Sequence, residues 1–257
     1  MSELPVIELR GIEKSFGPVH VLHEVGFSAY PGEVTALVGD NGAGKSTLVK
    51  CIGGTHPIDA GEFFFAGRPV QVHNPRDAAA LGIEIVYQDL ALCDNLDIVQ
   101  NMFLGRERRR GLVLDEYAME ELAVKTLASL SVRTVKSVRQ QVSSLSGGQR
   151  QTVAIAKAVL WNSKVVILDE PTAALGVAQT QQVLELVRRL ADQGLAVVLI
   201  SHNMNDVFAV SDRIAALYLG RMAAQVRTSD VTHSQVVELI TAGRSGALGL
   251  ETSGVTR

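Results

Sequence analysis

Three short motifs in this chain carry residue types that handle phosphates. They are Gly39–Ser46 with the sequence GDNGAGKS, Leu145–Gln149 with the sequence LSGGQ, and the acidic pair Asp169-Glu170. Glycine lets backbone N–H groups turn inward around an anion, lysine and serine add an ammonium and a hydroxyl group, and carboxylates bind a hard cation or accept a proton. Together the motifs predict a chain that binds the phosphates of a nucleotide together with a divalent cation.

The first motif is predicted to bind phosphate because of its setting. Glu33–Val38 predicts a buried strand before the loop, and Lys45–Ile52 predicts a helix after it. In that setting Lys45 should reach the β- and γ-phosphates, and the Ser46 hydroxyl should ligate Mg²⁺. Asp40 has the wrong charge for this task, so its side chain should point away. A glycine-rich turn that only packs tightly is the alternative, which the flanking elements disfavour.

The acidic pair follows Val165–Leu168, an apolar run that predicts a buried strand. Asp169, at the end of that strand, suits Mg²⁺, whereas Glu170 should point elsewhere and orient or deprotonate the attacking water. Alone, the pattern is more typical of a strand that ends at a solvated turn. The phosphate loop in the same chain reverses that preference.

The middle motif predicts the start of a helix. Ser146 and Gln149 precede the run Val153–Leu160 with the spacing of a capping box. A helix N-terminus lined by Gly147 and Gly148 is also a second anion site. In the expected fold this site cannot reach a phosphate held by its own chain's loop, so it predicts a contact with ATP bound to another subunit.

Strands and helices alternate along most of the chain, which predicts an α/β fold with a mostly parallel sheet and helices on its faces. From about residue 92 to 145 the pattern is helical, with Asp115 as a cap and apolar residues at helical spacing from Met119 to Leu130. Thr232 and Gln235 predict a last capping box, and Ser245–Arg257 is expected to fray. The expected strands are Val6–Leu9, His20–Phe27, Glu33–Val38, Glu62–Phe65, Ile83–Tyr87, Val165–Asp169, Ala196–Ser201, Ile214–Leu219 and Met222–Val226.

Composition limits the class of protein. With 257 residues, 47% of them hydrophobic, the chain can bury an ample core as one large domain or two small lobes. A net charge of −3 argues against a protein that binds polyanions through its bulk charge. Cys51 and Cys93 lack metal-site spacing and are expected to be reduced thiols. No apolar run approaches the ~20 residues that span a bilayer, and the N-terminus lacks signal-peptide features, so we expect a protein that stays inside the cell.

The motifs together resemble the ATP-binding-cassette (ABC) ATPases. Leu145–Gln149 matches that family's signature motif, Phe16 resembles its adenine-stacking aromatic residue, Gln88 its magnesium- and water-sensing glutamine, and His202 its switch histidine. The resemblance covers about residues 6–226. It implies a P-loop NTPase fold with an antiparallel β subdomain and an inserted helical subdomain at about 92–160. It also implies a single ATP-binding domain over residues 1–243, followed by a flexible tail at 244–257.

The resemblance also assigns expected roles to individual residues. The expected cofactors are ATP and Mg²⁺, and two chains should sandwich two ATP molecules. The expected catalytic residues are Glu170, His202 and Gln88, and the expected metal ligands are Ser46, Gln88 and Asp169. The expected nucleotide-binding residues are Phe16, Gly39, Asn41, Gly42, Ala43, Gly44, Lys45, Ser46, Thr47, Ser146, Gly147, Gly148 and Gln149.

Longer stretches are similar to the ATPases of monosaccharide importers of the ribose, xylose and fructose type. These stretches are Gly39–Gly54, Thr172–Val177 and Ser201–Phe208. The likeness implies transmembrane permease subunits, an indirect sugar-binding protein, a second copy of this chain, no nucleic acid, and a place at the cytoplasmic face of the membrane. None of these motifs touches a sugar, so they identify neither the sugar nor whether the paired cassette is identical or homologous.

One position departs from the family pattern. The turn after the acidic pair reads Ala174-Leu175-Gly176, where the family usually has Ala-Leu-Asp. The missing carboxylate normally helps to couple the two sites of a dimer, so coupling is in question while basic hydrolysis is not.

The alternatives to the ATPase of a sugar importer are the ATPase of another ABC transporter, a soluble ABC ATPase acting on DNA or ribosomes, and a phosphate-loop kinase. In a phosphate-loop kinase, Leu145–Gln149 would have no use.

Three further features of the sequence lie outside these motifs. Arg106 and Arg108–Arg110 suit a solvated surface better than contact with a membrane partner or anionic head groups. The segment Asp89–Asn101 lies where the family receives a membrane subunit, and Asp94, Asn95 and Asp97 within it suit fold and contact better than catalysis. His20 and His23 have metal-like spacing but no other ligand nearby in sequence, so metal binding is not expected there.

Overall fold

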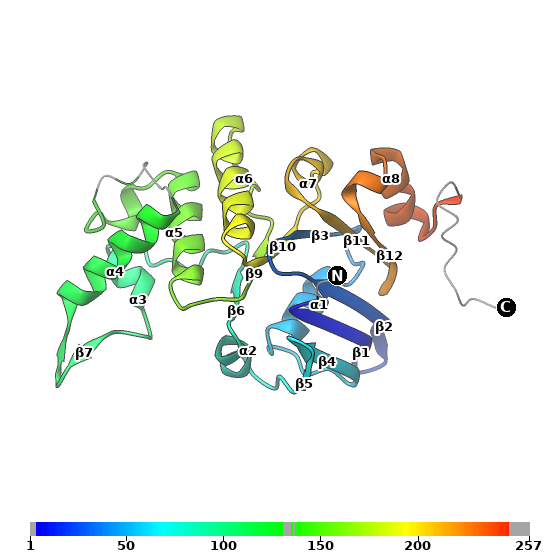
Figure 1. Cartoon of the computed structure of the whole chain (residues 1–257), viewed down its shortest axis with the longest axis horizontal. Helices are drawn as coiled ribbons and strands as arrows, with labels where there is room; N and C mark the ends of the chain where they lie inside the picture. Colours follow the sequence, from blue (N-terminus) through cyan, green and yellow to red (C-terminus); the bar gives the residue numbers. More distant parts are fainter. Residues whose placement is uncertain (1–3, 131–134, 136, 247–257) are drawn as a thin grey trace.

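A six-stranded sheet forms the centre of the computed structural model, which describes residues 4–130, 135 and 137–246 (Figure 1). The strand order is β12-β11-β3-β10-β9-β6, in which β12 alone pairs antiparallel. The mostly parallel α/β fold is therefore confirmed. The strands are β3 (Val34–Val38), β6 (Ile83–Val86), β9 (Val165–Asp169), β10 (Ala196–Ile200), β11 (Arg213–Tyr218) and β12 (Arg221–Arg227).

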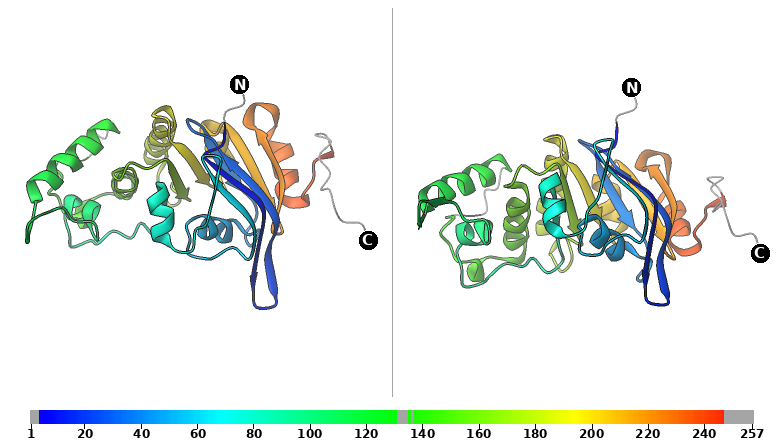
Figure 2. Two further views of the ribbon diagram at one scale, coloured as in Figure 1. Left: turned by 60° about the horizontal axis from the view of Figure 1, so that its bottom comes forward. Right: turned by 90° about the horizontal axis from the view of Figure 1, so that it is seen from below.

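A second, four-stranded antiparallel sheet has the order β2-β1-β4-β5. Its strands are β1 (Ile7–Phe16), β2 (Val19–Ala29), β4 (Ala60–Phe65) and β5 (Arg68–Val70). β1 extends seven residues beyond the predicted end at Leu9, because pairing with β2 supports polar residues that local propensity does not assign to a strand. Figure 2 shows the β1–β2 hairpin projecting from the rest of the molecule.

Helices cover both faces of the central sheet. α1 (Lys45–Ile52), with the bounds expected from the sequence, lies on the face toward the antiparallel sheet. α6 (Val177–Asp192), α7 (Met204–Val210) and α8 (His233–Ala242) lie on the opposite face, and α2 (Pro75–Leu81) leads into β6. α8 begins with the predicted capping box, in which the Thr232 hydroxyl accepts the Gln235 N–H at 3.4 Å.

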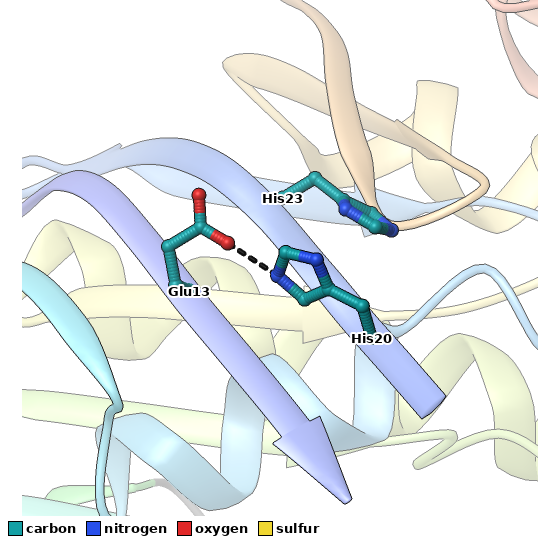
Figure 3. A group of neighbouring side chains, drawn as sticks. All are labelled: Glu13, His20 and His23. Carbon is teal, nitrogen blue, oxygen red and sulfur yellow. Dashed lines mark ion pairs between the residues drawn. The ribbon is translucent and has the colours of Figure 1, made fainter. Parts of the chain in front are cut away.

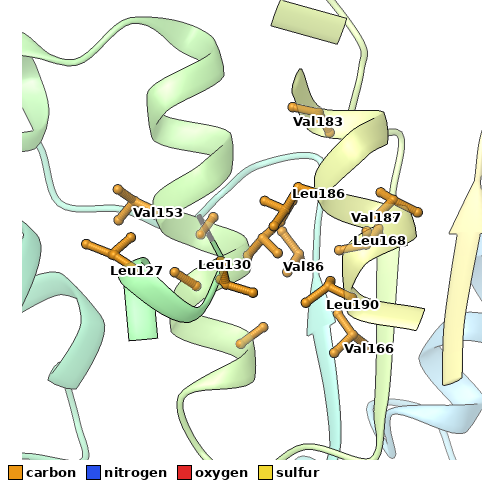
Figure 4. Packing of buried hydrophobic residues seen from close by; sticks show 14 of the residues in the cluster. Val86, Leu127, Leu130, Val153, Val166, Leu168, Val183, Leu186, Val187 and Leu190 are labelled. Atoms are coloured by element: carbon orange, nitrogen blue, oxygen red, sulfur yellow. The ribbon is translucent and has the colours of Figure 1, made fainter. Parts of the chain in front are cut away.

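The central strands are buried on both faces, which explains their continuous apolar runs. In β9, Val165 and Ile167 pack in the cluster that contains α1, whereas Val166 and Leu168 pack against the helices of the other side (Figure 4). All four side chains are fully buried. Packing on both faces fixes where β9 ends, and hence where its last residue, Asp169, and the next residue, Glu170, lie.

A helical lobe projects from one end of the sheet (Figure 1). It contains α3 (Ile98–Phe103), the short strands β7 (Arg109–Arg110) and β8 (Val113–Leu114), α4 (Glu116–Ser129), the 3₁₀ turn η1 (Val142–Ser144) and α5 (Gly147–Val159). α4 starts as predicted, because the Asp115 carboxylate accepts the Ala118 N–H at 3.1 Å. Residues of α4, α5 and α6 share one apolar cluster, so the lobe packs onto the sheet through α5 and α6.

Acidic residues in the segment before and within the lobe have structural partners. Asp97 caps α3 by accepting the Gln100 N–H at 2.7 Å, and Asp94 pairs with Arg150 at 3.0 Å. Arg106 pairs with Glu84 at 2.7 Å, whereas Arg109 and Arg110 are exposed.

The chain ends beyond α8. The Ser245 hydroxyl is buried and donates to Glu238 at 2.8 Å, so the expected fraying does not hold at this residue. Residues 247–257, the rest of the expected tail, lie outside the described residues, and the division at 243 and 244 stays a prediction. Within the described ranges, no helix is long and apolar enough to cross a membrane.

Candidate active site

Four neighbouring parallel strands end at one cavity. β3, β10, β9 and β6 are adjacent, and parallel strands place their carboxyl ends at the same edge of a sheet. The segments that follow them therefore converge around a cavity of about 620 Å³. Its lining residues are Val21, Gly39, Asp40, Asn41, Gly42, Gly44, Lys45, Ser46, Thr47, Gln88, Asp169, Glu170, Ala173, Ile200 and His202.

The loop between β3 and α1 requires glycine for two different reasons. At Gly39, a Cβ atom would lie 2.4 Å from the carbonyl oxygen of Leu217. At Gly44, the residue before α1, φ is +104°, a conformation that other residues rarely adopt. Among the described residues no side chain caps α1, so its first N–H groups remain available to an anion in the cavity.

Lys45 bonds to the loop's own backbone. Its Nζ donates to the carbonyl oxygens of Gly39 at 2.5 Å and of Asp40 at 3.0 Å. Partial burial lowers the pKa of Lys45, and the charges of Glu170, Asp40 and Asp169 oppose that shift. Phosphate oxygens are stronger acceptors than carbonyls, so a bound triphosphate would replace these bonds at little cost.

The two acids at the end of β9, Asp169 and Glu170, have different surroundings. Burial, and then the charge of Glu170, raises the pKa of Asp169, while Lys45 and Lys50 oppose the rise. Glu170 adopts φ of 51°, rare for a residue other than glycine, and its Oε2 lies 2.8 Å from Nδ1 of His202. A constrained backbone of this kind is typical of functional positions. Asp169 is thus the last residue of β9, and Glu170 meets His202, which follows β10.

The donor set suits a hard divalent cation. Ser46, Gln88 and Asp169 line the same cavity and offer a hydroxyl, an amide carbonyl and a carboxylate. Oxygen ligands of these kinds are the ones that Mg²⁺ takes beside phosphates. Their chemistry therefore fits this ion.

His202 is an exposed residue rather than a core histidine. Its side chain is 75% exposed and meets Glu170 at the mouth of the cavity. Nearby, the Thr172 hydroxyl donates to the buried Asp206 of α7 at 2.7 Å, which fixes the turn that follows the acids. Thr172 and Asp206 are 34 residues apart, and sequence patterns carry no signal of their pairing.

Two of the expected nucleotide-binding residues that precede α1, Ala43 and Phe16, do not line the cavity. Ala43 is 3% exposed, and its carbonyl oxygen accepts the Gly220 N–H at 2.9 Å. This bond holds the loop to the turn between β11 and β12. Phe16, at the end of β1, is 42% exposed and meets His56 edge to face. Conversely, sequence analysis missed Val21, Ala173 and Ile200, which reach the cavity only through the fold.

The middle motif, Leu145–Gln149, lies at the start of α5, outside the cavity. The predicted capping box is confirmed: the Ser146 hydroxyl accepts the Gln149 N–H at 3.3 Å, and the Gln149 side chain accepts the Ser146 N–H at 2.9 Å. Gly147 packs so closely that an added Cβ would lie 3.2 Å from Leu175, and one at Gly148 would lie 3.1 Å from Gln179. Gly147 therefore lies against the turn after Glu170 and Gly148 against the start of α6. Ser146, Gly147, Gly148 and Gln149 are not among the residues that line their own chain's cavity.

Comparison with known proteins gives a consistent result. The ABC transporter family model matches residues 22–173. The fructose import ATP-binding protein FrcA of Rhizobium meliloti is 46% identical, with 95% of this chain and 96% of that protein covered. The xylose/arabinose import ATP-binding protein XylG of Sulfolobus acidocaldarius is 43% identical, with 97% and 98% covered. The ribose import ATP-binding protein RbsA 2 of Escherichia coli O157:H7 is 37% identical, but this chain covers 47% of its length.

Solved structures share the fold. The ATP-binding cassette MJ1267 has a TM-score of 0.81 at 24% identity, with 92% of this chain and 96% of that chain covered. A dimeric structure of the bacterial ABC transporter cassette MJ0796 has a TM-score of 0.72 at 24% identity, with 86% and 98% covered.

Proposed function

This chain belongs to the ABC transporter family and is one of its ATPases, and on that premise we propose that it energises the import of a monosaccharide through a membrane permease. The observation that carries the proposal is the similarity, over nearly the full length of both chains, to ATPases named for fructose import and for xylose/arabinose import. The cavity itself has the features of a triphosphate site and carries no feature for a sugar. Sugar specificity would therefore reside in the permease and in a separate sugar-binding protein.

In this proposal the cavity binds ATP and hydrolyses it. Lys45 and the loop N–H groups bind the β- and γ-phosphates, and Phe16 stacks on the adenine. Glu170 accepts a proton from the attacking water, and His202, already in contact with Glu170, orients that carboxylate and meets the γ-phosphate. Ser46, Gln88 and Asp169 would hold Mg²⁺, which supplies charge neutralisation for the phosphates.

The site is completed by a second copy of the chain. Ser146, Gly147 and Gly148 form an anion-ready helix start that lies outside the chain's own cavity, so the proposal assigns them to the γ-phosphate held by a partner. ATP then binds the closed dimer better than the open one, and hydrolysis releases that preference. The turn from Thr172 to Gly176 contacts the start of α5, so it joins one chain's acids to the motif that serves the other chain's ATP.

The partners follow from this assignment. The chain would work at the cytoplasmic face of a membrane, bound to permease subunits through the region of residues 89–101 and the helical lobe. A sugar-binding protein on the far side would act through the permease. The net charge of −3 gives no support to a nucleic-acid partner.

Replacing Glu170 by Gln tests the site. The amide keeps the shape of the carboxylate but cannot accept the proton, so turnover should stop and an ATP-bound dimer should accumulate on size-exclusion chromatography with light scattering. Continued hydrolysis by a variant that remains monomeric with ATP would refute both the role of Glu170 and the sandwich.

Reconstitution tests the import assignment separately. The chain is purified with its permease, placed in proteoliposomes, and assayed for ATPase activity with and without a sugar-loaded binding protein. Stimulation by the loaded protein is expected. Hydrolysis that no sugar-loaded protein stimulates would favour the second candidate, an ABC transporter with another substrate, while leaving the ATPase assignment intact.

A further inference from the structure

Three potential metal ligands meet on the β1–β2 hairpin (Figure 3). Glu13 lies on β1, and His20 and His23 lie on β2. One ligand atom from each side chain lies within 4.8 Å of the other two. The two histidines had no third ligand nearby in sequence, because that ligand comes from the neighbouring strand.

A bulge in β2 places both histidines on one face. Ser15 pairs with His20 and Lys14 pairs with Leu22, so Val21 has no partner across the ladder. In a regular strand, residues three apart point to opposite faces. The extra residue cancels that alternation, and the two imidazole centroids lie 3.9 Å apart.

The backbone and neighbouring charges hold the cluster in place. Glu13 uses Oε1 to accept the Glu24 N–H at 3.2 Å, and its Oε2 pairs with Nε2 of His20. The His23 N–H donates to the Gly220 carbonyl oxygen at 2.8 Å. The neighbouring cation, Arg221, lies 4.0 Å from the Glu24 carboxylate, which opposes its charge.

We propose that Glu13, His20 and His23 form a binding site for a divalent transition-metal ion, with Zn²⁺ as the ion that the ligand types fit. Two imidazole nitrogens and one carboxylate oxygen are a known Zn²⁺ ligand set, with bonds of about 2.0–2.2 Å. The three ligand atoms lie within 4.8 Å of one another and must move closer to reach that distance from a common centre. His20 is 42% exposed at its side chain, which leaves room for water as a further ligand. This site differs in chemistry from the oxygen-lined nucleotide cavity, which suits Mg²⁺.

The test uses the full chain without a polyhistidine tag, stripped with EDTA and free of nucleotide, titrated with ZnCl₂ in a calorimeter. One Zn²⁺ per chain with micromolar or tighter affinity is expected. His20→Ala and His23→Ala should each weaken binding about 30-fold or more, and Glu13→Gln about 10-fold, since loss of even an outer-shell partner costs about 10- to 100-fold in metal affinity. His73→Ala is the matched control, an exposed histidine outside the cluster, and it should leave the affinity unchanged.

Co²⁺ gives an independent readout, because a site with nitrogen and oxygen ligands and low coordination number produces strong visible absorption. That absorption should appear with the parent chain and disappear in His20→Ala. Zn²⁺ affinity that is unchanged in His20→Ala, His23→Ala and Glu13→Gln, or that is lost instead in His202→Ala, would overturn the proposal. Glu13→Gln keeps the size of the side chain and the acceptor for Glu24, so it remains informative if a histidine variant does not fold.

Discussion

The starts of α1 and α5 both present backbone N–H groups to an anion, but their surroundings differ. α1 begins after Gly44 without a side-chain cap among the described residues, and it faces the cavity shared with Asp169 and Glu170. α5 begins at Ser146 within a complete capping box and lies outside that cavity. In our proposal, α1 belongs to a site which one chain can build, whereas α5 acts on ATP held by a second chain.

The largest effect is expected from Lys45→Ala, which changes the first residue of α1. Lys45 bonds only to loop carbonyls in the described structure, so the fold should persist. Loss of the ammonium should lower ATP affinity about 100-fold, equivalent to about 2.7 kcal/mol. Binding of a fluorescent ATP analogue measures this, and the exposed Lys125→Ala is the control. An affinity within a few-fold of the parent chain would contradict the assignment of this loop.

Ser146→Ala removes the side chain that caps α5. The chain offers a matched control in Thr232→Ala, because Thr232 caps α8 with the same capping box. Each substitution should cost about 1 kcal/mol of stability, measured by thermal or urea unfolding. Only Ser146→Ala should also reduce ATP hydrolysis, by about 10- to 100-fold, while leaving ATP binding to the single chain intact. Equal hydrolysis in the two variants would mean that Ser146 is a cap and nothing more.

Gly176→Asp tests the turn that joins the two regions. Gly176 precedes α6, and a Cβ atom there would meet nothing within 4 Å, so aspartate fits without displacement. The new carboxylate should cap α6 and add a few tenths of a kcal/mol to stability. If the missing acid weakens coupling between sites, the Hill coefficient of ATP hydrolysis should rise in this variant. An unchanged coefficient would show that this turn does not set the coupling.

The smallest expected effect is on the reactivity of a buried thiol on α1, that of Cys51. Cys51 on α1 is 2% exposed, and burial raises the pKa of its thiol to about 11. The thiolate is the reactive form, so Cys51 should resist a disulfide reagent in mildly alkaline buffer until the chain unfolds. Cys93 is only partly buried, so the native chain should react with about one equivalent of reagent and the unfolded chain with two, one for each of its cysteines. Two fast equivalents in the native chain would show that α1 opens readily.

The sequence predicted the parts of the site that depend on strand ends and helix starts. A local sequence pattern marks the phosphate loop, the acids at the end of β9 and the cap at Ser146. The parallel strands bring the first two together. The pairing of Thr172 with Asp206 has no such pattern, because it joins a turn to a helix far along the chain. The cluster of Glu13 with His20 and His23 depends on a bulge at Val21, and strand register of that kind is set by tertiary pairing rather than by local residue types.

Mixing two inactive variants tests the composite site most directly. Lys45→Ala lacks a working loop but keeps Ser146, and Ser146→Ala lacks the α5 contact but keeps the loop. Each mixed pair therefore contains one complete site, and equal amounts should recover about a quarter of the parent ATPase activity, since half of the random pairs are mixed and each has one of two sites. Activity no greater than the mean of the separate variants would contradict a site built from two chains.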